Sequence, residues 1–171
     1  MSDVLQSIRR FLTENRITFR EVHHGPTRTS EESARARGEP IEIGGKALVV
    51  KVGDHFFVFV MSAARKLDSA ALRDRFNAKK ARFATPDELK ALTGLTPGCV
   101  PPFGRPILQF DLYVDESITH NERIAFNAGS LTDSIIMSVA DYLRVAHPAG
   151  FFSFSLPGDD TDSRNGSPAA S

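Results

Sequence analysis

The architecture of this 171-residue chain follows from one stretch, GGKALVVKVGDHFFVFVM, at residues 44–61. Two runs rich in β-branched and aromatic residues, KALVVKV and HFFVFVM, flank Gly53 and Asp54. Two such runs joined by a pair of turn residues predict a β-hairpin. Because both runs are apolar on both faces, we expect the sheet to be buried, with helices covering it.

The sequence before this hairpin predicts a helix, a strand and a second helix. Apolar residues at helical spacing over residues 4–12 predict an amphipathic helix, and alternation over residues 17–23 predicts a short strand. Thr29 and Glu32 form the pattern of a capping box, which begins a helix that Gly38 can end.

The sequence after the hairpin predicts further helices and strands. Residues 67–76 have helical character, and Thr85, Pro86 and Glu88 mark the start of a helix that Gly94 can end. We expect strands over residues 107–114, 123–127 and 134–137, a helix over 138–145 and an edge strand over 151–156. Strands and helices are interspersed without a strict βαβ rhythm, which favours an α+β fold.

The length fits one folded domain, which we place at residues 1–156. Residues 157–171, PGDDTDSRNGSPAAS, contain no large apolar residue and are predicted to form a disordered C-terminal tail. The 21 basic and 21 acidic residues give a formal net charge of zero, so we expect no DNA partner and no general coating of a nucleic acid. Any contact with RNA must then come from a local basic patch.

The cellular compartment is predicted from the cysteine content and from the apolar segments. The one cysteine, Cys99, excludes an internal disulfide and fits a reducing compartment. The first residues, MSDVLQSIRRFL, lack the uninterrupted apolar core of a signal peptide. The longest apolar stretch, residues 56–61, is far too short to span a bilayer. We therefore expect a cytoplasmic protein with no membrane contact.

Several common chemistries lack their motifs. A phosphate-binding loop would need Ser or Thr directly after Lys46, where Ala47 stands. The five histidines show no metal-ligand spacing, so we predict neither a metal nor another cofactor. Ser130, in the sequence Ala-Gly-Ser, is not in the G-x-S-x-G context of a hydrolase nucleophile.

Lys46 is unusual because it begins an apolar strand directly after two glycines. A lysine at such a position can be partly buried, and its ammonium group then needs an anionic or strongly dipolar partner. The alternative is that Lys46 lies at the end of the strand and extends into water. The residue pattern leaves both interpretations open.

Two further features are candidates for function. The loop GCVPPFG at residues 98–104 combines stiff prolines with flexible glycines, which suits a site built from fixed backbone groups, although it could equally be a rigid connector. We interpret Cys99 within it as structural, because no histidine partner is evident. Residues 65–82 carry seven basic and two acidic side chains, which fits a phosphate-binding surface or an ordinary solvated face.

Three segments together resemble a known family: residues 44–61, residues 65–104 and FNAGSLTDSIIMSVADYL at residues 126–143. They resemble the YbaK family, also called the prolyl-tRNA-synthetase-associated editing domains, and the resemblance extends over residues 4–154. It implies an α+β fold in which a mixed, barrel-like, curled β-sheet is flanked by helices. It also implies hydrolysis of the aminoacyl ester at the 3′ end of a mischarged tRNA.

The resemblance assigns roles to individual residues. Lys46 matches the lysine that the family requires for catalysis. The GxxxP loop of the family matches residues 98–102, and its later turn matches residues 129–130, where this chain has no histidine. The predicted substrate-binding residues are therefore Gly98, Cys99, Val100, Pro101, Pro102, Gly129 and Ser130. From the basic run we add Arg73, Lys79 and Lys80 as predicted tRNA-binding residues.

These observations lead to the prediction of a trans-acting aminoacyl-tRNA deacylase for a small amino acid of the Ser, Thr or Ala class. The expected partners are the acceptor end of a mischarged tRNA and an aminoacyl-tRNA synthetase. The hydroxyls of Ser130 and Thr132 favour a hydroxylated amino acid, unless they only satisfy backbone groups of the turn. The alternatives are a non-catalytic module that binds tRNA or a synthetase, and a hydrolase of small free esters or amides.

Overall fold

The computed structural model describes residues 3–158. The helices are α1 (Asp3–Glu14), α2 (Ser30–Arg37), the short 3-10 helix η1 (Ile41–Ile43), α3 (Ser69–Phe76), α4 (Pro86–Thr93), α5 (Glu116–Thr119) and α6 (Val139–Ala146). The strands are β1 (Phe19–His23), β2 (Gly45–Val52), β3 (His55–Ser62), β4 (Arg65–Leu67), β5 (Ala81–Phe83), β6 (Asp111–Val114), β7 (Arg123–Asn127), β8 (Asp133–Ser138), β9 (Gly150–Phe151) and β10 (Ser155–Pro157).

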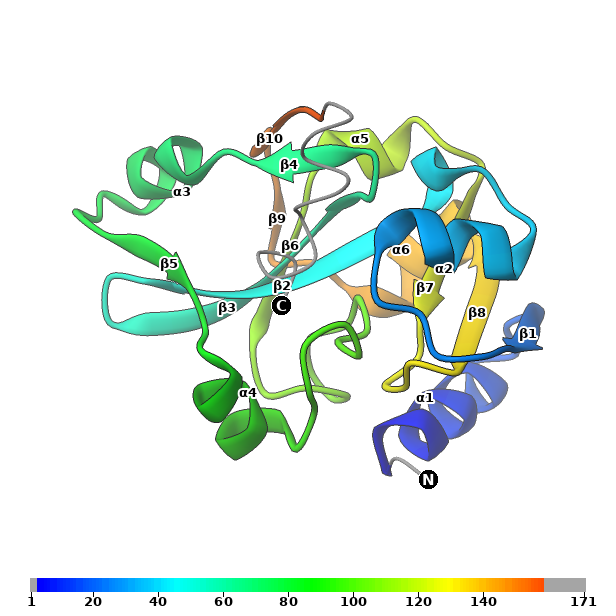
Figure 1. Cartoon of the computed structure of the whole chain (residues 1–171). Coiled ribbons are helices and arrows are strands. Elements are labelled where there is room, and N and C mark those ends of the chain that lie inside the picture. The colour runs from blue at the N-terminus through cyan, green and yellow to red at the C-terminus, as the bar shows by residue number, and fades with distance from the viewer. Residues whose placement is uncertain (1–2, 159–171) are drawn as a thin grey trace.

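The predicted hairpin is the centre of the molecule (Figure 1). Strands β2 and β3 pair antiparallel from Gly45 opposite Ser62 to Val52 opposite His55. They lie within a five-stranded sheet of order β5-β2-β3-β6-β9, in which β6 joins β3 in parallel. The prediction of a hairpin at residues 46–61 is therefore confirmed.

Both faces of the hairpin are covered, as its apolar pattern predicts. Ala47 and Val49 pack into one core cluster with α1 and α6, whereas Leu48 and Val50 pack into a second cluster beneath α3. Lys46 has the parity of Leu48, and Lys51 has the parity of Val49. The two lysines therefore lie on opposite faces of the sheet.

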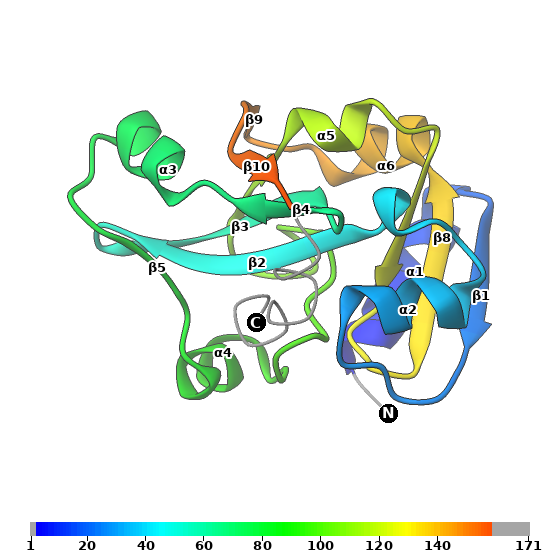
Figure 2. The same cartoon turned by 45° about the horizontal axis from the view of Figure 1, so that its top comes forward.

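A second, three-stranded sheet of order β1-β8-β7 lies beside the first one. Figure 2 shows α1 and α2 on opposite faces of this sheet. A single bridge between Gly44 and Ala125 connects the start of β2 with β7. At this junction α2, β2 and β7 meet.

The predicted α+β class is confirmed. The described strands do not, however, form the barrel-like, curled sheet that we expected. The described residues form three separate sheets, the third being the pair β10-β4, and none of the three closes on itself. The physical reason is strand length. The far edge of the central sheet is the two-residue strand β9, and β7 and β8 pair with β1 instead of continuing that sheet.

The predicted elements differ from the structure mainly in their ends. Both predicted capping boxes, at Thr29 and Thr85, are present. The helix expected from residue 67 begins at Ser69, because Leu67 belongs to β4. The strand expected over residues 107–114 is limited to Asp111–Val114.

The C-terminal prediction needs two corrections. The edge strand expected over residues 151–156 is divided into β9 and β10, which pair with β6 and β4 respectively. Pro157, the first residue of the expected tail, pairs with Arg65 as the end of β10. The rest of the tail prediction lies, apart from Gly158, outside the described residues.

Candidate functional site

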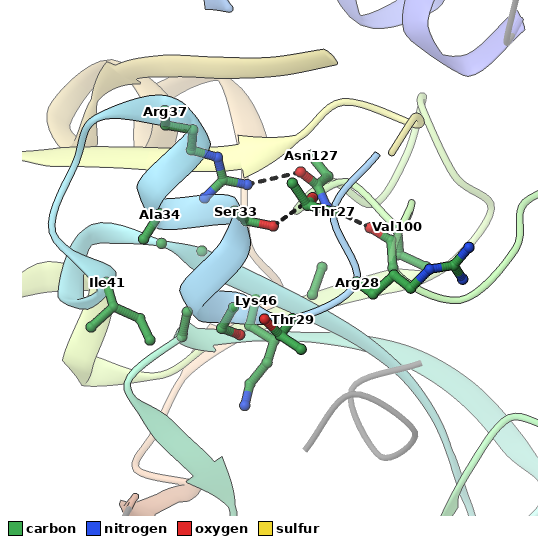
Figure 3. A pocket seen from close by; sticks show the side chains of 16 residues that line it. Thr27, Arg28, Thr29, Ser33, Ala34, Arg37, Ile41, Lys46, Val100 and Asn127 are labelled. Carbon is green, nitrogen blue, oxygen red and sulfur yellow. Dashed lines mark hydrogen bonds between the residues drawn. The ribbon is translucent and has the colours of Figure 1, made fainter. Parts of the chain in front are cut away.

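A small pocket opens where α2 meets the start of β2 (Figure 3). Some of the residues in the segment 27–37 line this pocket, together with residues 44–47 and with Gly98, Val100 and Asn127. Its volume is about 80 Å³. Pockets for drug-sized ligands measure roughly 300–1,000 Å³, so this pocket suits a much smaller group.

The two glycines before Lys46 are required by close packing. A Cβ atom on Gly44 would lie 2.8 Å from the Cβ of Ala63, and one on Gly45 would lie 2.5 Å from Cδ1 of Ile124. Both distances are too short for carbon atoms in contact. The glycines therefore let β2 pass close to its neighbours and bring Lys46 to the wall of the pocket.

Lys46 is half-buried and has a defined backbone partner. Its Nζ donates to the carbonyl oxygen of Arg65, at 2.8 Å. Lys51 lies on the other face, with Nζ 5.8 Å from the centre of the Phe56 ring. Of the two interpretations left open by the sequence, partial burial beside a dipolar partner is the one observed.

The loop of residues 98–102 presents only part of its length to the pocket. Gly98, in the left-handed region with φ 90°, and Val100 line it. Cys99, Pro101 and Pro102 are buried behind them. The loop thus forms one wall of the pocket, and Gly98 and Val100 are its residues that face the pocket.

The loop is held by hydrogen bonds at both ends. Asn127 Nδ2 donates to the carbonyl oxygen of Gly98 at 2.7 Å. The phenol of Tyr142, which is fully buried, donates to the carbonyl oxygen of Pro102 at 2.6 Å. Burial raises the pKa of Tyr142, so the phenol keeps its proton and remains a donor.

Ser130 does not line the pocket, and its hydroxyl is already engaged. It donates to Oδ2 of Asp133 at 2.8 Å and accepts from the backbone N–H of Thr132 at 3.0 Å. His23 contacts the other oxygen of Asp133, at 2.9 Å. The carboxylate lies between His23 and Ser130, so this trio lacks the serine–histidine contact of a catalytic triad.

The pKa of Asp133 reflects this network. Burial raises its pKa, but the hydrogen bonds from His23, Ser130 and Thr132 more than offset that effect and hold it below the usual value. Ser130 thus serves the turn in which it lies, together with Gly129, which has φ 75° and is buried. A substrate-binding role for these two residues stays a prediction.

Arg37 is a pocket residue that the sequence did not single out. Its guanidinium is buried and donates to Ser134 Oγ at 2.9 Å, to Asn127 Oδ1 at 2.9 Å and to the carbonyl of Ala125 at 3.5 Å. Burial lowers its pKa to about 10, which still leaves it charged at neutral pH. Within residues 3–158, each of these acceptors is a neutral oxygen.

The sequence carries one weak signal for this arginine. The last turn of α2 holds both Arg35 and Arg37, and only Arg37 lies four residues after Ser33 on the same face. Ser33 is also buried, and its hydroxyl is 2.8 Å from that of Thr27. These two hydroxyls line the pocket and were not anticipated either.

The basic residues of the run 65–82 differ in their exposure and in their partners. Lys79 and Lys80 are exposed after α3, and Arg73 is half-buried on that helix. Arg82 makes two hydrogen bonds to Glu88, at 2.8 and 3.0 Å, and is therefore already paired. None of the three predicted tRNA-binding residues lines the pocket.

The part of the chain that the structure describes holds neither a metal centre nor a membrane span. Within residues 3–158 no group of three or more His, Cys, Asp or Glu side chains is arranged to hold a metal ion. No helix in that same range has the length and apolar character needed to cross a bilayer.

Comparison with known proteins gives consistent similarities. Residues 24–145 match the family model of the aminoacyl-tRNA editing domain. The multifunctional Ser/Thr-tRNA deacylase ProXp-y of Escherichia coli (strain K12) is 34% identical over 143 residues, which are 80% of this chain and 84% of that protein. The proline–tRNA ligase of Macrococcus caseolyticus (strain JCSC5402) is 23% identical over 139 residues, 81% of this chain but 24% of the ligase.

One solved structure has a closely similar fold. The crystal structure of a protein proposed to be a trans-editing enzyme for prolyl-tRNA synthetase superposes with a TM-score of 0.77 at 22% identity. The match covers 91% of this chain and 99% of the other.

Proposed function

Because this chain belongs to the aminoacyl-tRNA editing domain family, we propose that it is a trans-acting deacylase of mischarged tRNA. Its substrate is the ester between a small amino acid, of the Ser, Thr or Ala class, and the terminal ribose of the tRNA. Action in trans is supported by the similarity to the Ser/Thr-tRNA deacylase of E. coli, of which the matched residues cover 84%.

One observation carries the proposal: Lys46 and the wall formed by Gly98 and Val100 share a pocket of about 80 Å³. Hydrolysis of an ester develops negative charge on the carbonyl oxygen, and donors placed in advance around that oxygen lower the barrier. Lys46 supplies a positive charge at the pocket wall and Gly98 supplies close backbone approach. A pocket of this volume supports a small acyl group.

The reaction needs no protein nucleophile. A water attacks the carbonyl carbon, the bond to the ribose oxygen breaks, and that oxygen leaves with a proton as a hydroxyl. The neighbouring ribose hydroxyl of the tRNA can help to take the proton of the water. Lys46 holds the carbonyl oxygen or the terminal phosphate, and the loop holds the ester in place.

The tRNA body is proposed to contact Arg73, Lys79 and Lys80. Gly53 donates its N–H to the carbonyl of Lys80, so this group lies at the far end of β2 from Lys46. Seven strand steps separate Lys46 from Gly53, about 23 Å at 3.3 Å per residue. One bound tRNA can cover this separation with its 3′ end at Lys46 and the phosphates of its acceptor stem at Lys79 and Lys80.

The remaining parts of the proposal concern partners and compartment. The similarity to prolyl-tRNA ligases supports an aminoacyl-tRNA synthetase as a partner. The expected compartment is the cytoplasm, where translation takes place.

Single-turnover deacylation of a panel of mischarged tRNAs tests the proposal. The panel carries seryl, threonyl, alanyl and a bulky aminoacyl ester, and the expected result is rapid hydrolysis of the small esters alone. Binding of the tRNAs without hydrolysis would show a non-catalytic module instead. Equal hydrolysis of small free esters would show that the tRNA is not the substrate.

A further inference from the structure

We propose that Arg37 is a positioning residue, which acts through the side chain of Asn127 to fix the carbonyl of Gly98 at the front of the pocket wall. The contacts are continuous: Arg37 Nη2 donates to Asn127 Oδ1 at 2.9 Å, and Asn127 Nδ2 donates to the Gly98 carbonyl at 2.7 Å (Figure 3). The proposal rests on the proposed deacylase function of the pocket.

A buried arginine without a carboxylate partner needs an explanation. Removing a charged group from water costs several kcal/mol, and a partner of opposite charge usually offsets part of this. Arg37 is 9% exposed, and its acceptors on Ser134, Asn127 and Ala125 are neutral oxygens. Packing alone would be served at least as well by an apolar side chain. The charge is therefore retained for what it does to its acceptors.

Arg37 can impose one orientation on the amide of Asn127. The oxygen and nitrogen ends of an asparagine amide have nearly the same shape, so hydrogen-bond partners determine which way the group points. A guanidinium has donors only. It therefore faces the amide oxygen, and the amide nitrogen of Asn127 must point the other way, toward the carbonyl of Gly98.

Ser134 accepts a further hydrogen bond from the guanidinium and is itself in contact with His24. The carbonyl of Gly25 can only accept, so His24 Nδ1, at 2.8 Å from it, carries a proton. His24 Nε2 lies 2.9 Å from the hydroxyl of Ser134, and Ser134 accepts from Arg37 Nε at 2.9 Å. The Ser134 hydroxyl also lies 3.3 Å from the amide oxygen of Asn127 and can donate to it. Arg37 is the closer donor to that oxygen.

Gly98 accepts the hydrogen bond from Asn127, and it is the end of the pocket wall that has the fewest other contacts to hold it in place. It has φ 90°, is exposed, and its carbonyl accepts one hydrogen bond in the described part of the chain, the one from Asn127. The other end of the loop is already fixed by Tyr142. Without the amide donor, Gly98 would be free to move while Pro102 stayed in place.

The first test replaces the donor without removing the partner of Arg37. In Asn127→Asp a carboxylate oxygen still accepts from Arg37, so the fold is kept and the buried charge gains a counter-charge. The second carboxylate oxygen faces the Gly98 carbonyl and cannot donate to it. We expect an unchanged or raised melting temperature, faster hydrogen exchange at the amides of Cys99 and Val100, and a fall in kcat/KM on the order of 10²-fold.

The second test is a double-mutant cycle. Arg37→Met and Asn127→Ala are made singly and together, and Arg35→Met, an exposed residue of the same helix, serves as the control with wild-type activity. If Arg37 acts through Asn127, the double variant is no slower than Asn127→Ala alone. Multiplicative losses would overturn the proposal, as would wild-type loop exchange and kcat/KM in folded Asn127→Asp.

The proposed function and the proposed role of Arg37 can fail separately. A wild-type protein that hydrolyses none of the esters contradicts the proposed function. Hydrogen exchange at residues 98–100 still tests the positioning role in that case, because it needs no substrate. Faster exchange in both Arg37→Met and Asn127→Asp, with intact melting, is the result that supports positioning.

Discussion

The phenolic oxygen of Tyr142 lies 2.6 Å from the carbonyl oxygen of Pro102 and is its buried donor. The contact joins α6 to the last residue of the loop that forms the pocket wall. Forty residues separate the two partners in the sequence, so the loop takes its position from a distant helix.

Tyr142→Phe removes this donor and leaves a buried carbonyl unpaired. An unsatisfied buried polar group costs about 1–3 kcal/mol, and the free energy of unfolding should fall by that amount. Urea denaturation measures it. The control is Tyr113→Phe, since the Tyr113 hydroxyl makes no hydrogen bond in the described residues. Equal losses in the two variants would mean that the Pro102 contact contributes nothing specific.

Lys46→Ala should abolish most deacylation in a folded protein. Loss of one charge contact to the developing oxyanion commonly costs about 2.7–4 kcal/mol, which corresponds to 10²–10³-fold in rate. Lys51→Ala is the matched control, because it lies in the same strand on the opposite face and should remain close to wild type. Single-turnover rates compare the two, and a Lys46→Ala enzyme as active as wild type would remove Lys46 from the mechanism.

A triple variant with alanine at Arg73, Lys79 and Lys80 should bind tRNA more weakly, while hydrolysis of bound substrate changes little. The logarithm of the affinity falls linearly with the logarithm of the salt concentration. The slope of that line should become less steep by about 0.7–0.9 for each phosphate that the variant no longer neutralises. Filter binding over a salt series gives both quantities. Alanine at Arg10 and Arg144, which are exposed on α1 and α6, should leave the slope unchanged. An unchanged slope in the triple variant would mean that the run is only a solvated face.

Substrate choice should depend on Thr27 more than on Ser130. The Thr27 hydroxyl lines the pocket beside Ser33, whereas the Ser130 hydroxyl is held by Asp133. A site that bonds a hydroxyl can strongly reject an analogue without one, so Thr27→Val should narrow any preference for seryl over alanyl ester by at least about tenfold. Ser130→Ala should keep the ranking. A changed ranking in Ser130→Ala alone would return that residue to the specificity argument.

The contribution of Asp115 to the free energy of unfolding depends on pH. Burial raises its pKa, but hydrogen bonds from Ser117, Phe154 and Ser155 outweigh this and hold the pKa below its usual value. A carboxylate whose pKa is lower in the folded than in the unfolded protein stabilises the fold at pH values above its unfolded pKa of about 3.9. This stabilisation is lost as the pH falls through the pKa of the folded state. Asp115→Asn should therefore cost roughly 1.5–3 kcal/mol at neutral pH.

The cost of Asp115→Asn should shrink in acid as the wild-type carboxylate takes up a proton. Urea unfolding at neutral pH and at about pH 3 measures this convergence. Asp111→Asn, at an exposed surface ion pair, should cost little at either pH. A difference between Asp115→Asn and wild type that stayed constant with pH would show that the carboxylate charge is not involved.

What the sequence could predict depended on local rules. The hairpin follows from apolar runs around Gly53, and the starts of α2 and α4 follow from side-chain caps at Thr29 and Thr85, all of which are decided within a few residues. The separation of Lys46 and Lys51 onto opposite faces follows from strand periodicity alone.

What the sequence could not predict depended on distant partners. Arg37 matters because Asn127, 90 residues later, is its acceptor. The last strands are divided because Asp115 binds the backbone N–H of Phe154, which no pattern within residues 151–156 indicates. The closure of a barrel was likewise a question of which strands pair, and no short stretch of sequence contains that information.

The pairing of β1 with β8 has a consequence for synthesis on the ribosome. Phe19 can pair only after its strand partner Met137 has been made, and the pocket residues near Thr27 precede Asn127 by about 100 residues. At translation speeds of about 5–20 residues per second, that delay is roughly 5–20 s. During this time Phe19 and Val22 of β1 have no sheet to pack in, and no nascent chain that stops short of Asn127 contains the whole pocket. The growing polypeptide therefore holds a complete pocket only after Asn127 has been synthesised.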